Sequence, residues 1–203
     1  MILNSNIPGA KLLKASFYSP MVLSLVVCGL IWGWMYQPAN GLINETLRAL
    51  GLDSLTQGWL SDKKTVMWSI IAVAIWRQVG YVMILYLAGL QSVDPALLDA
   101  SKVDGCSAWQ TFRCVVFPLL APVTVIVMTI SIIDSLRAFD LVSVMTRGGP
   151  YNSSSVLANF MYIEAFNNYK MGYGAAISVI LFLISLIFIF IYLYRTLQTE
   201  LEY

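Results

Sequence analysis

The sequence has no histidine among its 203 residues, and charged residues make up only 11% of it. Without histidine the chain cannot form a Ser-His or Cys-His nucleophile pair or a His-ligated zinc site, and we expect no catalytic residues. Soluble domains contain about 25% charged residues, whereas this chain is 59% hydrophobic. An ordinary soluble domain is therefore excluded. The net charge of +1 gives no basic footprint for nucleic acid, so no nucleic-acid partner is expected.

Cysteine is also scarce. Cys28 lies in an apolar run, and Cys106 and Cys114 have no further cysteine pair at the spacing of a metal site. We interpret all three as small buried or interfacial thiols. No metal site is predicted.

Long apolar runs are what the sequence does contain. A helix needs roughly 20 apolar residues to cross a bilayer core, and four runs qualify: Ala15–Tyr36, Thr65–Leu90, Phe117–Ile133 and Gly174–Tyr194, which ends at Arg195. The first run is too long for a cleavable signal peptide and ends in aromatic residues suited to a membrane interface. The sequence predicts an all-α, polytopic bundle of about four transmembrane helices, embedded in lipid and forming one domain over residues 1–203.

Three loops join these runs. Gln37–Lys64 and the first part of Asp134–Tyr173 are polar and rich in turn residues, including Gly148-Gly149-Pro150. Four spans place both termini on the same side as the loop 91–116. Lysine and arginine are divided almost evenly between the two sides, so the positive-inside rule does not decide the orientation.

The loop 91–116 has the strongest local signals. Asp94 suits a helix N-cap and Pro95 the first helical position, so Ala96–Asp104 is predicted to be a short helix. Gly105 stands where a left-handed residue ends a helix. Ser107-x-x-Gln110 is a capping box that begins a second helix, in which Trp109, Phe112 and Val116 recur at helical spacing. The pattern predicts a helix–glycine–helix elbow at the membrane surface, although an ordinary amphipathic connector would share its composition.

The residue spacing in this elbow resembles a known family. Asp99-Ala100-Ser101 is followed by three residues, Gly105, nine residues and then Val115-x-Phe117-Pro118. This is similar to the "EAA" loop of binding-protein-dependent ABC importer permeases, which reads Glu-Ala-Ala, three residues, Gly, nine residues, Ile-x-Leu-Pro. Asp99, Ser101, Val115 and Phe117 replace the family's Glu, Ala, Ile and Leu.

Further motifs resemble the maltose-type sugar permeases within that family. They cover nearly the whole chain: Gly41-Leu42-Ile43-Asn44, Leu87-Ala88-Gly89-Leu90-Gln91, Phe139-Asp140, Thr146-x-Gly148-Gly149-Pro150 and Gly172-Tyr173-Gly174-Ala175-Ala176. The resemblance implies the permease subunit of an ATP-driven importer of sugars or related small solutes in the bacterial cytoplasmic membrane.

The resemblance also implies an orientation and a set of partners. The elbow would face the cytoplasm, where its first helix docks on ATP-hydrolysing subunits, so the chain itself needs no cofactor. A second permease subunit and an extracytoplasmic solute-binding protein would complete the importer. ATP binding would move the elbow and rock the spans between inward-facing and outward-facing states.

One departure from the family concerns length. Such permeases usually have about six spans, and here the resemblance begins at the third, so two N-terminal spans are expected to be missing. A non-functional truncated permease is then an alternative, as is an importer of glycerol phosphate or another polar solute. A secondary transporter is a rival of another class, but it would want an intramembrane acid, and the acids lie in loops or at span ends.

Polar residues within the spans are the candidates for a solute path. Arg77 near the centre of a span costs about 2.5–3.5 kcal/mol on insertion scales, so it should face the bundle interior or water. It could line the path with Gln78, Tyr81 and Phe139, or it could hold two helices together. Asp134 and Arg137 are spaced to pair on a helix, and they could contact solute or simply cap the third span.

Overall fold

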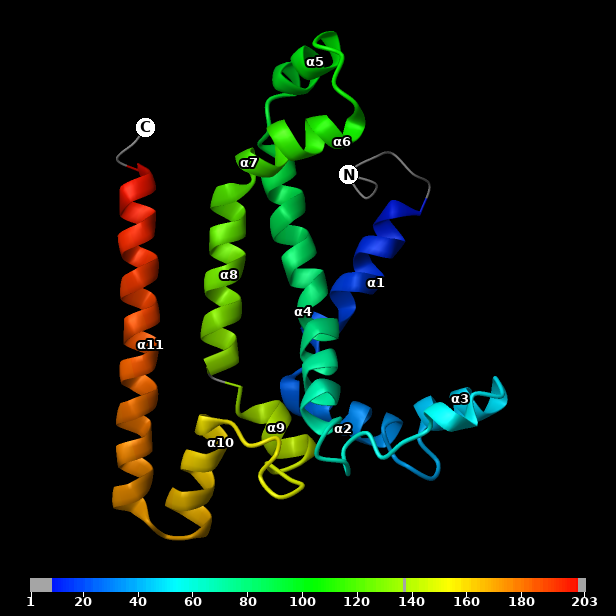
Figure 1. Ribbon diagram of the computed structural model, residues 1–203, viewed down its shortest axis with the longest axis vertical. Coiled ribbons are helices and arrows are strands. Elements are labelled where there is room, and N and C mark those ends of the chain that lie inside the picture. Colours follow the sequence, from blue (N-terminus) through cyan, green and yellow to red (C-terminus); the bar gives the residue numbers. More distant parts are fainter. Residues whose placement is uncertain (1–8, 137, 201–203) are drawn as a thin grey trace. The chain divides into compact units, whose positions relative to one another are not determined.

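The computed structural model describes residues 9–136 and 138–200, and within these residues its regular structure is entirely helical (Figure 1). The chain forms two compact units, one made of Met1–Val22 and Trp76–Ser131 and the other of Leu23–Ile75 and Ile132–Tyr203. The all-α class predicted from the sequence is confirmed. The long helices α4 (Val66–Gln91) and α8 (Ala121–Leu136) each contribute residues to both units.

The first unit is held together where α1 (Ala10–Val22) crosses α4 at Gly80. A Cβ placed at position 80 would overlap the carbonyl oxygen of Phe17 and lie 2.7 Å from the Cα of Tyr18. The two helices therefore meet backbone to backbone. Helices in lipid associate through small residues that permit such close packing, because lipid supplies no hydrophobic force between them.

The first unit also contains the elbow that joins α4 to α8. Its elements are α5 (Pro95–Val103), α6 (Ala108–Thr111), the π-helical segment η3 (Phe112–Val116) and α7 (Phe117–Leu119). In Figure 1 these elements lie beyond the C-terminal end of α4. The predicted loop 91–116 is thus largely helical.

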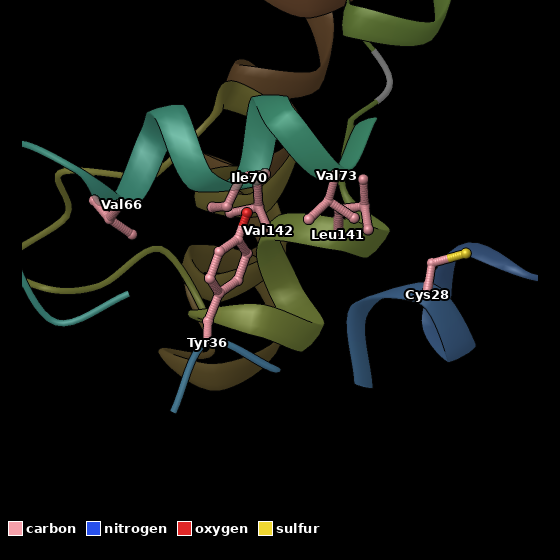
Figure 2. Packing of buried hydrophobic residues seen from close by; sticks show 7 residues of the cluster. All are labelled: Cys28, Tyr36, Val66, Ile70, Val73, Leu141 and Val142. Atoms are coloured by element: carbon pink, nitrogen blue, oxygen red, sulfur yellow. The ribbon is translucent and has the colours of Figure 1, made fainter. Parts of the chain in front are cut away.

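The second unit is built around an apolar cluster (Figure 2). It involves α2 (Leu25–Met35), the start of α4 and α9 (Asp140–Met145), and its buried members are Cys28, Tyr36, Val66, Ile70, Val73, Leu141 and Val142. The Tyr36 hydroxyl donates to the Ser69 carbonyl oxygen at 3.3 Å. Cys28 is fully buried, as expected for a thiol in an apolar run.

Short helices occupy the two polar segments of this unit, for which the hydropathy pattern predicts loops. Residues 37–64 contain α3 (Leu42–Ala49) and η2 (Asp53–Leu55). Residues 134–173 contain the end of α8, then α9, α10 (Leu157–Tyr162), the π-helical segment η4 (Ile163–Asn167) and the start of α11 (Met171–Glu200). These elements are too short to give a long apolar run.

Two of the four predicted spans are confirmed as continuous helices. Within the described residues, α4 and the 171–191 part of α11 are each long and apolar enough to cross a membrane, and two broken helix pairs would raise the number of spans to four. The helix that contains the fourth apolar run, α11, extends beyond Arg195 to Glu200. A change from apolar to polar composition ends a membrane span, whereas arginine is a good helix former and does not end a helix.

The first predicted span is wrong as a single helix, because it breaks at Leu23–Ser24. Pro20 lacks the N–H group that would bond to the Ser16 carbonyl oxygen, and the Ser19 hydroxyl donates to that oxygen instead at 2.9 Å. The Ser24 hydroxyl then caps the first turn of α2. Each end at the break therefore has a hydroxyl group that satisfies a backbone atom.

The third predicted span begins at Ala121 rather than at Phe117. Phe117–Leu119 belongs to the elbow, and the helix axis bends by 65° between Ala108–Leu119 and Ala121–Leu136. Pro122 has no N–H for the Pro118 carbonyl oxygen, which accounts for a break at this position.

We predict that Gly80→Ala destabilises the protein, whereas Gly33→Ala does not. Alanine favours a helix interior over glycine by about 1 kcal/mol, and a Cβ at Gly33 meets nothing within 4 Å. At Gly80 the overlap with the α1 backbone reverses that gain, since overpacking costs about 1–3 kcal/mol. Thermal unfolding in detergent, followed by tryptophan fluorescence, should show a lower Tm for Gly80→Ala only. Equal Tm values for the two variants would contradict the close approach.

Candidate functional site

The elbow begins with a capped helix. The Asp94 carboxylate accepts a hydrogen bond from the Ala96 N–H at 2.8 Å, and Pro95 occupies the first position of α5. Both predicted roles are confirmed, with the helix running from Pro95 to Val103 rather than from Ala96 to Asp104. The cap satisfies one of the free N–H groups at the start of the helix, so α5 has a fixed beginning despite its short length.

Gly105 ends α5 in the left-handed conformation, with φ of +76°. Its N–H donates to the Lys102 carbonyl oxygen at 3.1 Å, and the Cys106 N–H donates to the Ser101 carbonyl oxygen at 3.0 Å. This pair of bonds is a Schellman motif, which satisfies carbonyl groups at the helix end. A Cβ at Gly105 would meet nothing within 4 Å, so the need for glycine arises from the backbone angle and not from crowding.

The second arm of the elbow starts with the predicted capping box. Ser107 N–H donates to the Gln110 side-chain oxygen at 2.8 Å, and Gln110 N–H donates to the Ser107 hydroxyl at 3.4 Å. The arm is not one regular helix, however, because α6 passes into π-helix at Phe112. Trp109 still stacks on Phe112, with ring centroids 5.6 Å apart. The wider π turn shifts the register that a simple helical spacing predicted.

A buried pair of hydroxyl groups ties the two arms together. The Ser101 and Thr111 side-chain oxygens lie 3.1 Å apart, and these residues are only 4% and 8% exposed. Ser101 donates to the Leu98 carbonyl oxygen at 2.8 Å, so Thr111 supplies the proton between the two hydroxyls. Ser101 stands where the family pattern has alanine. Thr111 therefore satisfies the hydroxyl group that this replacement buries, a partner that the spacing alone did not reveal.

The outer surface of the elbow combines exposed apolar side chains with charges. Val103 and Trp109 are 88% and 67% exposed. Asp99 and Lys102 form an ion pair of 2.7 Å in which both side chains are 71% exposed, so the pair adds little stability. The remaining elbow residues of the motif are Ala100, Phe117 and Pro118, which are exposed, and Val115, which is half-buried. Exposed apolar groups rimmed by charges are typical of a protein-binding surface.

The predicted solute-path residues fall in different units. Arg77, Gln78 and Tyr81 are half-buried on α4 in the first unit, and Arg77 and Tyr81 share a helix face. Phe139 precedes α9 in the second unit, where its ring lies 5.0 Å from that of Tyr162. The grouping of all four remains a prediction.

Gly80, which lies between Gln78 and Tyr81, leaves no open gap beside them, because the backbone of α1 at Phe17 and Tyr18 fills the space. Asp134 lies near the end of α8, and its expected partner Arg137 lies outside the described residues.

The second unit holds a polar site that the sequence analysis missed. Asn44 is 1% exposed and bonds to the carbonyl oxygens of Pro38 and Gln57 and to the Trp59 indole N–H. A single asparagine thereby ties α3 to the chain on both sides of it. The only sequence signal was the position of Asn44 in the motif Gly-Leu-Ile-Asn.

A second polar cluster shapes the turn after α9. The Thr146 and Ser154 hydroxyls lie 2.8 Å apart, and Ser154 is fully buried. Two pairs of adjacent residues have positive φ: Arg147 with Gly148, and Tyr151 with Asn152. Tyr151 is 86% exposed, and the Lys63 ammonium group lies 4.0 Å from its ring centroid. The turn therefore has a buried polar centre at Ser154 and an exposed tip at Tyr151. Within the described part of the chain, no group of three or more His, Cys, Asp or Glu could hold a metal ion.

Comparison with known proteins places the whole chain in one family. Residues 3–202 match the family model described as binding-protein-dependent transport system inner membrane component. A probable ABC transporter permease of Pyrococcus horikoshii is 42% identical over 187 residues, which are 92% of this chain and 64% of the relative. A probable starch degradation products transport system permease of Thermoanaerobacterium thermosulfurigenes is 33% identical over 202 residues, 100% of this chain and 68% of the relative.

Another relative is the trehalose/maltose transport system permease of Thermococcus litoralis, which is 32% identical over 95% of this chain and 64% of its own length. The fold matches the crystal structure of a bacterial ABC transporter involved in the import of the acidic polysaccharide alginate. The TM-score is 0.84 at 21% identity, covering 98% of this chain and 69% of that chain. The chain thus spans 64% of the length of two of these relatives.

The family match and the apolar helices both indicate a multi-pass protein of the inner membrane. The resemblance that the elbow spacing indicated is confirmed over nearly the whole sequence. The chain belongs to the family of binding-protein-dependent transport system inner membrane components.

Proposed function

We propose that the chain is the permease subunit of an ATP-driven importer that carries sugars or related small solutes. The observation that carries this proposal is the elbow between α4 and α8. It has a side-chain cap at Asp94, a Schellman motif at Gly105, a capping box at Ser107 and a hydroxyl tie between its arms. Such a structure can transmit a push without bending, which a solvated connector cannot do.

The exposed side of the elbow is the proposed docking surface for the ATP-hydrolysing subunits. Leu97, Val103 and Trp109 supply apolar contact area, and Trp is among the residues that dominate binding energy at interfaces. ATP is bound and hydrolysed by those partner subunits, so the chain carries no cofactor of its own. Closure of the ATPase would move the elbow and, through it, the helices at its two ends.

The sugar class is proposed from the relatives. Their names refer to starch degradation products and to trehalose/maltose, and the matching structure to the acidic polysaccharide alginate. Arg77 would suit an acidic sugar, because a guanidinium pairs with carboxylates and phosphates. An importer of glycerol phosphate or another polar solute keeps the same architecture and is the second candidate.

The opposite side is the proposed site for the solute-binding protein. Because α4 is one continuous helix, the segment before Val66 and the elbow after Gln91 fall on opposite sides of the membrane if α4 spans it. The Asn44 network, Lys63 and the exposed Tyr151 belong to that other side. A structural match, at a TM-score of 0.84 and 21% identity, is a transporter in complex with a periplasmic protein, which supports this assignment. A second permease subunit would complete the pathway.

A secondary transporter is the rival proposal. It would need an ionisable acid within a span to bind a proton or cation. Neither Val66–Gln91 nor the 171–191 segment contains aspartate or glutamate. The elbow also has no role in a transporter without an ATPase. Copurification with a soluble ATPase separates the two proposals.

We predict that Gly105→Val uncouples transport from ATP hydrolysis. A β-branched residue in the left-handed region costs about 1–2 kcal/mol, which would disrupt the Schellman motif. Gly105→Asn is the matched control, because asparagine tolerates this conformation. In proteoliposomes containing the assembled importer, uptake per ATP hydrolysed should fall for valine and be retained for asparagine. Wild-type coupling in the valine variant would contradict a mechanical role for the elbow.

The orientation makes a second prediction, in which Asn44 and Gly149 face the periplasm and Ser101 and Tyr203 face the cytoplasm. Asn44 and Ser101 are buried and Tyr203 lies outside the described residues, so neighbouring exposed positions serve better. In a cysteine-free background, an impermeant maleimide should label Asp53→Cys and Asn152→Cys in intact cells. Val103→Cys should react only after the cells are opened. Labelling of Val103→Cys from outside would reverse the orientation.

A third prediction concerns Arg77 as a residue of the path. Arg77→Ala should lower uptake of an alginate oligosaccharide by about tenfold or more, because a hydrogen bond to a charged group contributes about 1.5–3 kcal/mol. Maltose uptake, measured in parallel, should fall less. The yield of assembled complex should stay normal, and Arg77→Lys should recover only part of the activity because it lacks the planar fork. A loss of assembled complex in Arg77→Ala would instead identify a structural role.

A further inference from the structure

The backbone joins the elbow to α4 at its N-terminal end and to α8 at its C-terminal end. Any displacement of α5 and α6 must pass through these attachments. If the two helices could slide along each other, movement of the elbow would change their register instead of tilting them together. The contact between α4 and α8 near the elbow therefore decides how much of the elbow's displacement is passed to these two helices.

Close packing forms one half of this contact. A Cβ placed on Gly89 would lie 2.6 Å from Val123 Cγ2 and 3.0 Å from Leu120 Cδ2, so α4 and α8 pack closely at this glycine. Leu120 is 5% exposed. Van der Waals contact of this kind brings the helices together, because many short contacts add up to a substantial attraction.

A chain of two hydrogen bonds beside this packing forms the other half. The Tyr86 hydroxyl donates to Thr124 Oγ1 at 3.1 Å, and Thr124 Oγ1 donates to the Leu120 carbonyl oxygen at 3.0 Å. Leu120 follows α7 directly and lies at the 65° bend between the elbow and α8. The bonds thus link α4 to the residue at which the elbow becomes a membrane helix.

We propose that Tyr86 and Thr124 are positioning residues that clamp α4 to α8, so that the two helices move as one body when the elbow is pushed. This inference rests on the proposed importer function. A hydrogen bond has a preferred direction, so the bond from Tyr86 to Thr124 adds to the Gly89 contact in fixing the register of the two helices. Neither residue belongs to the elbow motif or to the predicted solute path.

Another hydroxyl on α8 supplies the comparison. Thr129 Oγ1 donates to the Val125 carbonyl oxygen at 2.8 Å within its own helix, and Thr129 is half-buried. Like Thr124, Thr129 donates to the carbonyl oxygen four residues earlier in its own helix. Unlike Thr124, it has no hydrogen bond to α4. Thr129→Val accordingly removes a hydroxyl from α8 and leaves the clamp intact.

The test uses Tyr86→Phe, Thr124→Val and the double variant, with Thr129→Val as control. Each importer complex is reconstituted in proteoliposomes, and uptake of maltose and of an alginate oligosaccharide is measured per ATP hydrolysed. Each clamp variant should lower this ratio by about threefold or more, the range expected for an interhelical hydrogen bond in lipid. ATP hydrolysis itself should persist. The double variant should be no worse than the single ones, because both remove the same bond.

A second measurement does not require transport. In the purified full chain without native cysteines, spin labels at Ile84 on α4 and Val125 on α8, both partly exposed, report the distance between the helices. The distance distribution should broaden in Tyr86→Phe and stay unchanged in Thr129→Val.

Unchanged uptake per ATP hydrolysed in Tyr86→Phe and Thr124→Val would overturn the clamp. A lower yield of assembled complex with normal uptake per ATP would also overturn it, because the bond would then be structural only. Failure of the proposed importer function would look different. In that case the wild-type complex itself would show no ATP-dependent uptake, while the spin-label distances would still report whether the helices are clamped.

Discussion

The structure depends on one constraint: a backbone N–H or carbonyl group in or near hydrocarbon needs a partner supplied by the protein itself. Continuous helices meet the constraint automatically, but this chain breaks its helices where it must turn. At such places a side chain or a left-handed residue takes over. Ser19 and Ser24 do so around the first break, Asp94 and Ser107 begin the elbow helices, and Gly105 ends one of them.

Glycine performs two unrelated tasks in this fold. At Gly80 and Gly89 it lets neighbouring helices approach to distances at which a Cβ would overlap their atoms. At Gly105 the surroundings are open and only the backbone angle requires it. Replacing these residues should therefore have different consequences. A change at Gly80 acts on the packing of helices in lipid, whereas a change at Gly105 acts on the shape of a surface element.

The elbow combines local rigidity with few attachments, which suits a lever. Its arms are tied by the Ser101–Thr111 hydroxyl pair, and its outward surface carries apolar side chains that the rest of the described chain leaves exposed. Below it, Tyr86, Gly89 and Thr124 join the two helices from which it extends. The segments near the N-terminal end of α4 are built differently. There, Asn44 and the turn at Thr146–Ser155 form hydrogen-bonded polar structures. Within the proposed importer, the elbow would bind the ATP-hydrolysing subunits, and the polar structures near the start of α4 would face the solute-binding protein.

The sequence by itself determined the features that arise from neighbouring residues. The caps at Asp94 and Ser107 and the left-handed Gly105 could be predicted because cap chemistry acts within a few residues, and hydropathy found the apolar runs. The spacing of the elbow residues was enough to identify the family. Only the tertiary structure decided that α1 fills the space beside Gly80, that Thr111 satisfies Ser101 and that Tyr86 reaches Thr124. Hydropathy reports how strongly a residue avoids water, but it carries no information about which helix lies against which.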